Sequence, residues 1–397
     1  MRYLKKFLLI ALAVLIAIQV PFIYRRYQLG KVAEKISASN ASRIVRTDDK
    51  FDEYVGIIHA HTFLGGHSNA KFDELIKGAN DAGVDFVMMT EHWSDDYDTS
   101  ALTLNGKYGR TLFIGGNEID TADGDRFLMI PGSAEAASLR KLSTDAVLAK
   151  LHAEHRLGLI TYPERYKSWN ASFDGIEVFS LHTSAKAINK FTGPFDILWS
   201  GRAYPQLTFA QYFRRPDANL AKFDEASQKR RLTLFTGTDA HSNIGFHLFG
   251  DDAGHKLLDI KLDPYAFSFS MARVHILLPK GTPLTRDSAV DAVKSGRFYI
   301  GIDAIGDTSG FRFSANESIY GDETPAANVQ QLEVFVPVTS RVVLLMNGAR
   351  VDERPATGEI AFATSGPGVY RVEVYRDDLG EPFSQMPWIM SNPIYLR

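Results

Sequence analysis

The chain has 397 residues, 45% of them hydrophobic, a formal net charge of −3 at pH 7 and no cysteine. This length accommodates one large domain and a smaller one. The weak negative charge argues against a general surface for polyanions such as nucleic acid. The lack of cysteine excludes disulfides, thiolate metal ligands and cysteine nucleophiles.

The chain begins with a long apolar segment, residues 7–24, which has basic residues on both sides. A helix of that length reaches about 27 Å, close to the thickness of a membrane's hydrocarbon core. No small residues with the spacing of a signal-peptidase site follow it. We therefore expect an uncleaved signal anchor, a transmembrane helix, over residues 1–28 and a polar linker over 29–52. The soluble part would then be extracytoplasmic, and periplasmic in a bacterium; the alternative is secretion after signal-peptide cleavage.

From residue 53 to residue 305, short apolar runs alternate with amphipathic stretches. Two of these stretches, 70–83 and 143–158, have the apolar spacing of helices, and we expect Gly158 to end the second. Strands alternating with helices predict an α/β domain with a parallel sheet or barrel. The strands are predicted at 54–59, 84–90, 111–117, 127–131, 157–162, 174–179, 232–238 and 273–278.

Residues 306–397 have the pattern of an all-β domain. Period-two alternation is clearest at Tyr370, Val372 and Val374, and Asn347-Gly348 is typical of a tight hairpin turn. No helical pattern interrupts these runs. We expect a small antiparallel β-sandwich. It carries no dense group of His, Asp or Glu, so its expected role is packing, docking or framing the substrate.

Histidines and acids lie at the ends of predicted strands in the α/β domain. Side chains at the carboxyl ends of parallel strands meet at one mouth of an α/β barrel, and His59 and His61 share one face of their strand. Imidazoles mixed with carboxylates bind zinc, manganese or iron. Each residue alone has an ordinary structural explanation, such as a polar group at a barrel rim, but their gathering on four strand ends favours a metal site. The candidate ligands are His59, His61, His67, His92, Glu118, Asp239 and His241.

The segments IHAHTFLGGHS, VDFVMMTEH, GGNEI and TGTDAHS resemble the four main motifs of the polymerase-and-histidinol-phosphatase (PHP) superfamily, over roughly residues 54–300. The resemblance implies a distorted (β/α)7 barrel that hydrolyses phosphate esters with two or three metal ions. It implies a first ion held by His59, His61, Glu118 and Asp239. It also implies a second ion held by His67, His92 and His241, with Glu118 able to bridge the two.

The sequence departs from the PHP pattern in two places. Where the family commonly has a His-Pro pair that serves a third ion, this chain has Tyr162-Pro163, and no counterpart of the family's other third-site histidine follows the Glu118 strand. We therefore expect two ions rather than three. Glu91 stands where the family usually has Asp, and we expect it to support the ligands rather than to bind metal.

The expected reaction follows from the ions. Two divalent ions activate a bridging hydroxide that attacks the substrate directly, because no GxSxG elbow or cysteine supplies a nucleophile. Glu118 and Asp239 are the expected catalytic carboxylates. Tyr162 either donates a proton to the leaving group, binds the substrate or fills the vacant third-ion position. Arginine suits an anionic substrate, and the candidates for substrate binding are Arg126, Arg165 and Arg202.

The remaining histidines are not expected to bind metal. A predicted helix carries two of them, and we interpret these as structural. The others follow different segments, and although some could face the mouth, we expect them to be surface or loop residues. The residues concerned are His152 and His155 on the helix, and His182, His247 and His255 elsewhere.

The sequence favours a membrane-anchored, metal-dependent phosphoesterase that acts on a small-molecule or polymer-linked ester. The alternative is a carbamate or carboxylic ester hydrolase on the same barrel, which fits a site with one cation fewer. A third possibility is a non-catalytic, receptor-like binding module. The complete set of candidate ligands argues against that third possibility, because a site freed from catalysis has little reason to retain buried charge.

Overall fold

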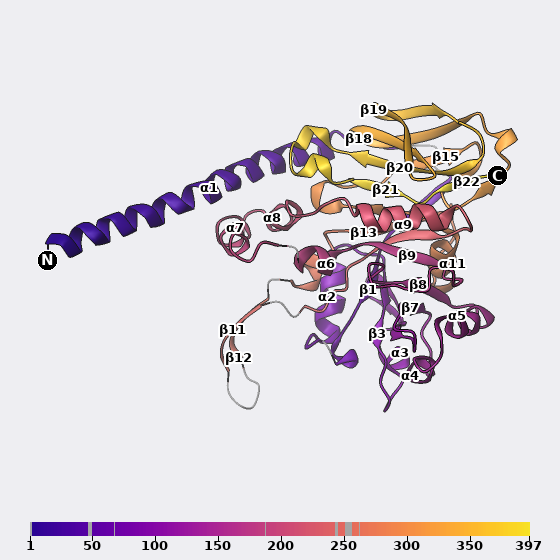
Figure 1. Ribbon diagram of the computed structural model, residues 1–397, viewed down its shortest axis with the longest axis horizontal. Helices are drawn as coiled ribbons and strands as arrows, with labels where there is room; N and C mark the ends of the chain where they lie inside the picture. Colours follow the sequence, from indigo (N-terminus) through magenta and orange to yellow (C-terminus); the bar gives the residue numbers. More distant parts are fainter. Residues whose placement is uncertain are drawn as a thin grey trace.

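The computed structural model describes residues 2–46, 50–66, 68–186, 188–242, 245–250, 256–261 and 263–397. In 245–250 and 256–261 only the backbone is described, and these segments form the hairpin β11 (Gly245–Gly250) and β12 (Lys256–Lys261). His67 and His255 lie outside the described residues, as does the side chain of His247. The chain is a mixed α/β protein with a sheet-rich C-terminal part (Figure 1).

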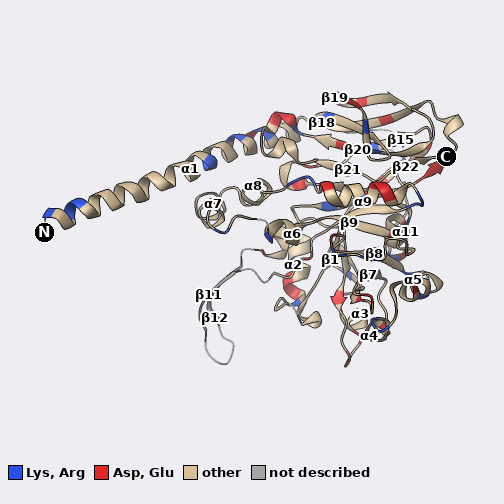
Figure 2. Cartoon of the chain, in the orientation of Figure 1, with Lys and Arg blue, Asp and Glu red and all other residues tan. Residues whose placement is uncertain are grey.

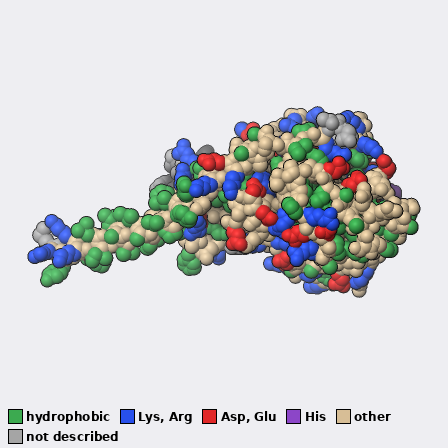
Figure 3. Space-filling model, turned by 90° about the horizontal axis from the view of Figure 1, so that it is seen from above, with side chains coloured by type: hydrophobic (Ala, Val, Ile, Leu, Met, Phe, Trp, Pro, Cys, Tyr) green, Lys and Arg blue, Asp and Glu red, His purple; other side chains and the backbone are tan. Residues whose placement is uncertain are grey.

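The first helix, α1 (Arg2–Ala41), projects far from the rest of the molecule (Figure 1). Apolar side chains cover it between basic residues near its start and its middle, and these apolar side chains are exposed (Figure 3). Among the described residues it is the one helix long and apolar enough to cross a membrane, judged by length and composition. Its second half contains the buried residues Phe22, Leu29 and Val32, and it runs without a break into the predicted linker.

Two sheets form the body of the molecule, and the pairing of the described strands does not close them into one barrel. The larger has the order β16-β15-β18-β20-β21-β14-β13-β1-β2-β5-β4, and the second has the order β10-β9-β8-β7-β6-β3. The parallel bridge Ala60↔Ala240 lies between the end of β1 and the segment after β10. The strands of the α/β part are β1 (Phe51–Ala60), β2 (Phe86–Met89), β3 (Glu91–His92), β4 (Gly106–Tyr108), β5 (Thr111–Ile114), β6 (Asn117–Asp120), β7 (Arg126–Ile130), β8 (Leu157–Ile160), β9 (Gly175–Ser180), β10 (Thr233–Gly237), β13 (Arg273–Pro279) and β14 (Phe298–Gly301).

The sheet is not uniformly parallel, unlike the simple expectation from alternating strands and helices. Strand β7 is antiparallel to both β6 and β8, and β13 is antiparallel to β1. The link from β6 to β7 contains no helix, so the chain returns directly and must run antiparallel. The distorted (β/α)7 barrel therefore stays a prediction.

Helices flank these strands. Ser143 caps α5 by accepting a hydrogen bond from the Ala146 N–H. The expected end of this helix at Gly158 is wrong, because the helix stops at Ala153 and Gly158 lies inside β8. His155 takes a left-handed conformation there, with φ 57°. The other helices are α2 (Phe72–Asp81), α3 (Thr99–Leu102), α4 (Ala136–Leu139), α5 (Thr144–Ala153), α6 (Leu181–Lys186), α7 (Gly193–Ser200), α8 (Pro205–Ala210), α9 (Asp217–Ser227), α10 (Tyr265–Ser268) and α11 (Arg286–Ser295), with short 3₁₀ turns η1 (Phe63–Gly65), η2 (Asp303–Ile305), η3 (Ala326–Asn328), η4 (Asp377–Leu379) and η5 (Phe383–Gln385).

The C-terminal strands continue the larger sheet. Strand β21 pairs with β14, so the C-terminal part and the α/β part share one run of hydrogen-bonded strands (Figure 1). One core cluster likewise includes Leu29 of α1, Phe223 of α9 and Trp388. The predicted boundary at residues 305 and 306 stays a prediction. The C-terminal strands are β15 (Arg312–Ala315), β16 (Ser318–Ile319), β17 (Glu323–Thr324), β18 (Gln331–Met346), β19 (Ala349–Ala363), β20 (Gly368–Tyr375), β21 (Ile389–Ser391) and β22 (Ile394–Leu396).

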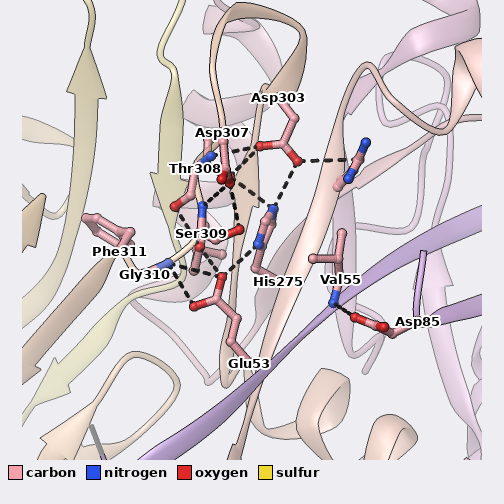
Figure 4. Close-up of polar contacts among 12 residues, drawn as sticks. Glu53, Val55, Asp85, His275, Asp303, Asp307, Thr308, Ser309, Gly310 and Phe311 are labelled. Atoms are coloured by element: carbon pink, nitrogen blue, oxygen red, sulfur yellow. Dashed lines mark hydrogen bonds and ion pairs between the residues drawn. The ribbon is translucent and has the colours of Figure 1, made fainter. Parts of the chain in front are cut away.

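A largely buried polar network joins residues of β1, β13, β14, η2 and β15, and Figure 4 shows part of it. His275 Nδ1 lies 2.9 Å from Glu53 Oε1, and its Nε2 lies 3.2 Å from Asp303 Oδ2. Glu53 also accepts hydrogen bonds from Tyr299 and Arg312, at 2.7 and 2.6 Å. We refer to these five residues as the Glu53–His275 network.

Candidate metal centre

The end of β1 positions two histidines by leaving regular strand geometry. His59 has φ 73°, and the pairing of β1 with β2 shifts register between Ile58 and Ala60. The two imidazoles therefore converge through an irregularity in the strand rather than through simple alternation. Their ring centroids lie 5.1 Å apart, and both rings are buried. A left-handed histidine is uncommon, and such backbone strain is concentrated at functional sites.

Three other segments bring their side chains to the same place: His92 ends β3, Asp239 and His241 follow β10, and Glu118 is the second residue of β6 rather than the end of a strand as expected. His92 and Glu118 are direct partners in the pairing of β3 with β6. Asp239 also has a left-handed backbone, with φ 46°. The ring of His61 stacks between those of His92 and His241, at centroid distances of 4.8 and 4.5 Å.

The two carboxylates lie at the centre of this group. Glu118 Oε2 is 3.5 Å from His59 Nε2, 3.3 Å from His61 Nε2 and 3.5 Å from His92 Nε2. Asp239 Oδ1 is 3.3 Å from the Nε2 atoms of both His59 and His61. We call the six residues that meet here the mouth cluster: His59, His61, His92, Glu118, Asp239 and His241.

The donor atoms of the mouth cluster fit a divalent metal. Two sets have ligand atoms within 4.8 Å of one another, and His61 belongs to both. Among the described residues, both ring nitrogens of His59 and His61 and the Oδ1 atom of Asp239 are buried without a hydrogen-bond partner. Buried polar atoms are ordinarily paired, so these unpaired donor atoms are available to bind a metal ion. The sets are His59, His61, Glu118 and Asp239, and His61, His92 and His241.

The ionisation of His61, Glu118 and Asp239 suits a cation, whereas a protonated His59 would have to lose its proton to bind one. Burial lowers the pKa of His61 to about 4, so its imidazole is neutral and can donate a lone pair. Burial alone would raise the pKa of Glu118, but the charge of His59 outweighs it and lowers that pKa to about 2. Asp239 is likewise held well below its ordinary pKa despite burial, chiefly by His59. Burial disfavours the charged form of His59, yet its carboxylate neighbours raise its pKa well above the usual value.

Tyr162 lies directly beside the mouth cluster. Its hydroxyl donates a 2.6 Å hydrogen bond to Asp239 Oδ2, and its backbone is left-handed, with φ 52°. Burial and the neighbouring Asp239 raise its pKa, so the phenol stays protonated. Tyr162 thus fixes the orientation of the Asp239 carboxylate while leaving Oδ1 free to face the histidines.

Glu91 lies next to the cluster but faces away from its donor atoms. It accepts hydrogen bonds from the N–H and hydroxyl of Thr62, at 2.9 and 2.6 Å, and from the hydroxyl of Thr103, at 2.9 Å. It is not a member of either ligand set found among the described residues. Glu91 therefore holds the loop that follows His61.

Glu177 is a member of the site that the sequence analysis missed. It is buried in β9, and its Oε2 lies 3.4 Å from His59 Nδ1. Thr161 donates a hydrogen bond to the same oxygen. A Cβ at Gly237 would lie 2.0 Å from Glu177 Oε1, so only glycine leaves room for this carboxylate. The available signal was an acid inside the apolar run GIEVFS.

The mouth cluster opens into a cavity of about 580 Å³. Of the three candidate arginines, Arg126 lines it, with Nη1 at 3.4 Å from Glu118 Oε1 and Nε at 2.7 Å from Asp120 Oδ1. Arg165 is exposed, and its guanidinium lies 6.0 Å from the Tyr162 ring centroid. Arg202 is exposed between α7 and α8 and does not line the cavity. The structure therefore brings one of the three to the site.

The other described histidines considered above differ in whether they line the cavity. His152 lies on α5 and is exposed beside Asp174, whereas His155 lies just past the end of that helix rather than on it. His182 instead lines the cavity, with its ring centroid 6.0 Å from that of His241. Burial lowers its pKa. The expectation of a surface or loop role for His182 therefore needs correction, because α6 starts at Leu181 and turns the next residue inward.

Comparisons with known proteins give distant likenesses. No protein-family model matches the sequence, and no curated protein matches it. The solved structures that are similar to this chain include three proteins. PsfC from Pseudomonas syringae has 13% identity and a TM-score of 0.35, with 60% of this chain and 88% of that chain covered. A two-domain protein from Bacteroides vulgatus, described as containing a predicted PHP-like metal-dependent phosphoesterase, has 12% identity and a TM-score of 0.36, with 89% and 98% covered.

The third is Endonuclease Q in complex with a duplex that carries an abasic lesion. It has 12% identity and a TM-score of 0.34, with 61% of this chain and 57% of that chain covered. At these TM-scores the likenesses establish neither a shared fold nor a shared activity. The chemistry of the site rests on the mouth cluster itself.

Proposed function

We propose that this protein is a metal-dependent hydrolase of PHP type and that its substrate is a phosphoester. The observation that carries the proposal is the mouth cluster, in which buried imidazole and carboxylate atoms without hydrogen-bond partners meet at the head of a cavity. The four PHP-like motifs supply every described member of that cluster. The soluble part would be held at a membrane by α1, on an extracytoplasmic face.

We assign two ions to the cluster. The first would be held by His59, His61, Glu118 and Asp239. The second would be held by His92 and His241 together with His67, and Glu118 would bridge the two. Bound ions would supply the positive charge that acidifies a water molecule and neutralises the leaving oxygen. Zinc, manganese and iron all suit this donor set.

The protein's own side chains have distinct tasks in this proposal. Glu118 and Asp239 stay ionised and hold the cations. Tyr162 orients Asp239 through its hydrogen bond, and its raised pKa favours this positioning role over proton donation. Arg126 presents a guanidinium to the cavity, where it can contact an anionic oxygen of the substrate.

The cavity also gives a reason to consider carbamate or carboxylic ester hydrolysis. Arg126 is the one Lys or Arg among the described residues that line the cavity, and it already contacts Asp120 and Glu118. An uncharged ester needs no further cation, whereas a phosphate dianion would rely on the metal ions. This second function uses the same ligands and the same water.

A substrate panel tests the proposal. The full chain, purified in detergent and loaded in turn with zinc, manganese or iron, would be assayed on an aryl phosphate, an aryl phosphodiester and an aryl carbamate. Hydrolysis of a phosphoester that Asp239→Asn abolishes supports the proposal. Hydrolysis of the carbamate alone favours the second function. No hydrolysis in any arm, or full activity in Asp239→Asn, contradicts the assignment.

A further inference from the structure

Part of the cavity lining is apolar and has no task in the hydrolysis itself. Leu181 and Ala185 are one turn apart on α6 and line the cavity together. Phe209 on α8 and Phe267 on α10 line it as well, with their ring centroids 5.0 Å apart. We call these four residues the apolar wall. An ionic ester alone would gain nothing from it, because apolar surface is stabilised by contact with apolar groups.

Helix α8, which carries Phe209, is also attached to α1. The Arg26 guanidinium lies 5.9 Å from the centroid of the Tyr204 ring, at the start of α8. A Cβ at Gly30 would lie 2.9 Å from the Tyr204 hydroxyl, so glycine allows close contact. At the rise of an α-helix, Gly30 is only about 9 Å beyond Tyr24, the last residue of the apolar run. The apolar wall is therefore built on a helix that meets α1 just past its apolar segment.

Helix α7 contacts α1 within that segment. Phe22 stacks on Phe195 with centroids 5.0 Å apart, and Trp199 donates a 2.8 Å hydrogen bond to Gln19. Figure 1 shows α7 and α8 on the side of the body from which α1 projects. Leu198 of α7 and the nearby Phe191 are 73% and 85% exposed. Exposed apolar groups and a tryptophan at this level are typical of a surface in contact with the membrane interface.

We propose that the substrate is a phosphate monoester of a long-chain lipid, taken from the bilayer that α1 crosses. This inference rests on the proposed function. The apolar chain lies against the apolar wall, and the phosphate reaches the mouth cluster. The oxygen of water bonds to phosphorus, the bond from phosphorus to the lipid oxygen breaks, and that oxygen takes a proton from water. The products are a lipid alcohol, which returns to the bilayer, and inorganic phosphate.

The first test is the dependence of turnover on chain length. Each methylene buried against an apolar surface strengthens binding by a factor of about two to four. The full chain, loaded with metal in detergent, should therefore hydrolyse ethyl, butyl, hexyl and octyl phosphate with kcat/KM rising by about 10²-fold or more across the series, measured as released phosphate.

Variants of the apolar wall sharpen this test. Phe209→Ser should flatten the rise with chain length, and Phe209→Leu should restore most of it. Leu142→Ser removes an apolar side chain that is 39% exposed and does not line the cavity, and it should leave the whole series unchanged. Ethyl phosphate turnover with no rise along the series overturns the inference alone. No turnover at any chain length overturns the proposed function as well.

The second test asks where the substrate comes from. The full chain would be reconstituted into phosphatidylcholine vesicles, with phosphatidic acid either in the same vesicles or in separate ones. Cleavage confined to the shared vesicles supports delivery from the bilayer. Equal cleavage in both arrangements overturns membrane delivery, and octyl phosphate in solution reports in either case whether the metal-loaded protein is active.

Discussion

The mouth cluster and the Glu53–His275 network are both buried groups of histidine and carboxylate, yet they differ in how their polar atoms are used. In the network, both ring nitrogens of His275 have partners, and Glu53 accepts hydrogen bonds on both oxygens (Figure 4). In the mouth cluster, both ring nitrogens of His59 and His61 lack hydrogen-bond partners among the described residues. None of the five network residues lines the cavity into which the mouth cluster opens.

This difference separates a structural group from a site built for a ligand. Burying polar atoms without partners costs free energy, and a bound cation would offset that cost in the mouth cluster. The backbone agrees, since His59, Tyr162 and Asp239 all have positive φ, while no residue of the network does. Charged residues of both signs are spread along the whole chain in Figure 2, so the distribution of charge along the chain does not mark the site. The mouth cluster is marked instead by its buried polar atoms without hydrogen-bond partners and by its residues with positive φ.

Replacing the shared carboxylate should have the largest effect. Glu118→Gln keeps the size of the side chain but removes the charge that three histidines face. We expect kcat/KM to fall by about 10³- to 10⁴-fold, equivalent to about 4–5 kcal/mol of transition-state stabilisation. The free energy of unfolding of the metal-free protein should change far less, as measured by urea denaturation. Activity within tenfold of the parent would remove Glu118 from the site.

The corresponding change in the network should affect stability instead. Glu53→Ala leaves His275 and Arg312 buried without their carboxylate, and we expect a loss of about 3–5 kcal/mol in the free energy of unfolding. Bound metal per folded chain should not change. Glu317→Gln, which removes an exposed partner of Lys50, is the matched control and should leave stability almost unaltered. Loss of metal in Glu53→Ala would erase the distinction between the two regions.

The network should also give stability a pH dependence of known sign. Despite burial, Asp303 and Glu53 raise the pKa of His275 to about 9, against an ordinary 6.5. Its contribution is therefore fully present below pH 6.5 and is lost as pH rises through 9, by about 3 kcal/mol. Urea denaturation between pH 6 and 9.5 should show this decline in the parent and a smaller one in His275→Gln. Identical profiles would contradict the assignment.

Two tyrosines allow the finest comparison, because each donates to a carboxylate in one of the two regions. Tyr162→Phe removes the hydrogen bond to Asp239 and should lower activity by about 10- to 100-fold with little change in stability. Tyr299→Phe removes the hydrogen bond to Glu53 and should cost about 1–2 kcal/mol of stability with little change in activity. The reverse pattern would show that the roles have been exchanged.

Much of the fold and of the mouth cluster could be predicted from local sequence patterns. Strand β1 and helix α2 lie where apolar patterns place them, and residues at or just after the ends of β1, β3 and β10 meet in the mouth cluster. Glu118 joins them from inside β6 rather than from the end of a strand. These features follow from short-range periodicity and from the common direction of strands that alternate with helices. The long apolar run likewise becomes one exposed helix.

Local sequence patterns could not predict which strands from distant parts of the chain pair, or in which direction. The antiparallel course of β7 and the single sheet that joins β14 to β21 depend on contacts between distant segments. The left-handed turn at His59 cannot be read from an HxH motif. Glu177 was missed because an isolated acid in a strand has several explanations until a neighbour such as His59 Nδ1 is known.

Metal content tests the central claim most directly. The purified full chain, His61→Ala and His275→Gln would be dialysed against trace zinc, manganese and iron and measured by mass spectrometry of the elements. His61 belongs to both ligand sets of the mouth cluster, whereas His275 belongs to neither. We expect about two ions per chain in the parent and in folded His275→Gln, and about one or fewer in His61→Ala. No metal in the parent, or an equal loss in both variants, would contradict the assignment of the mouth cluster as the metal centre.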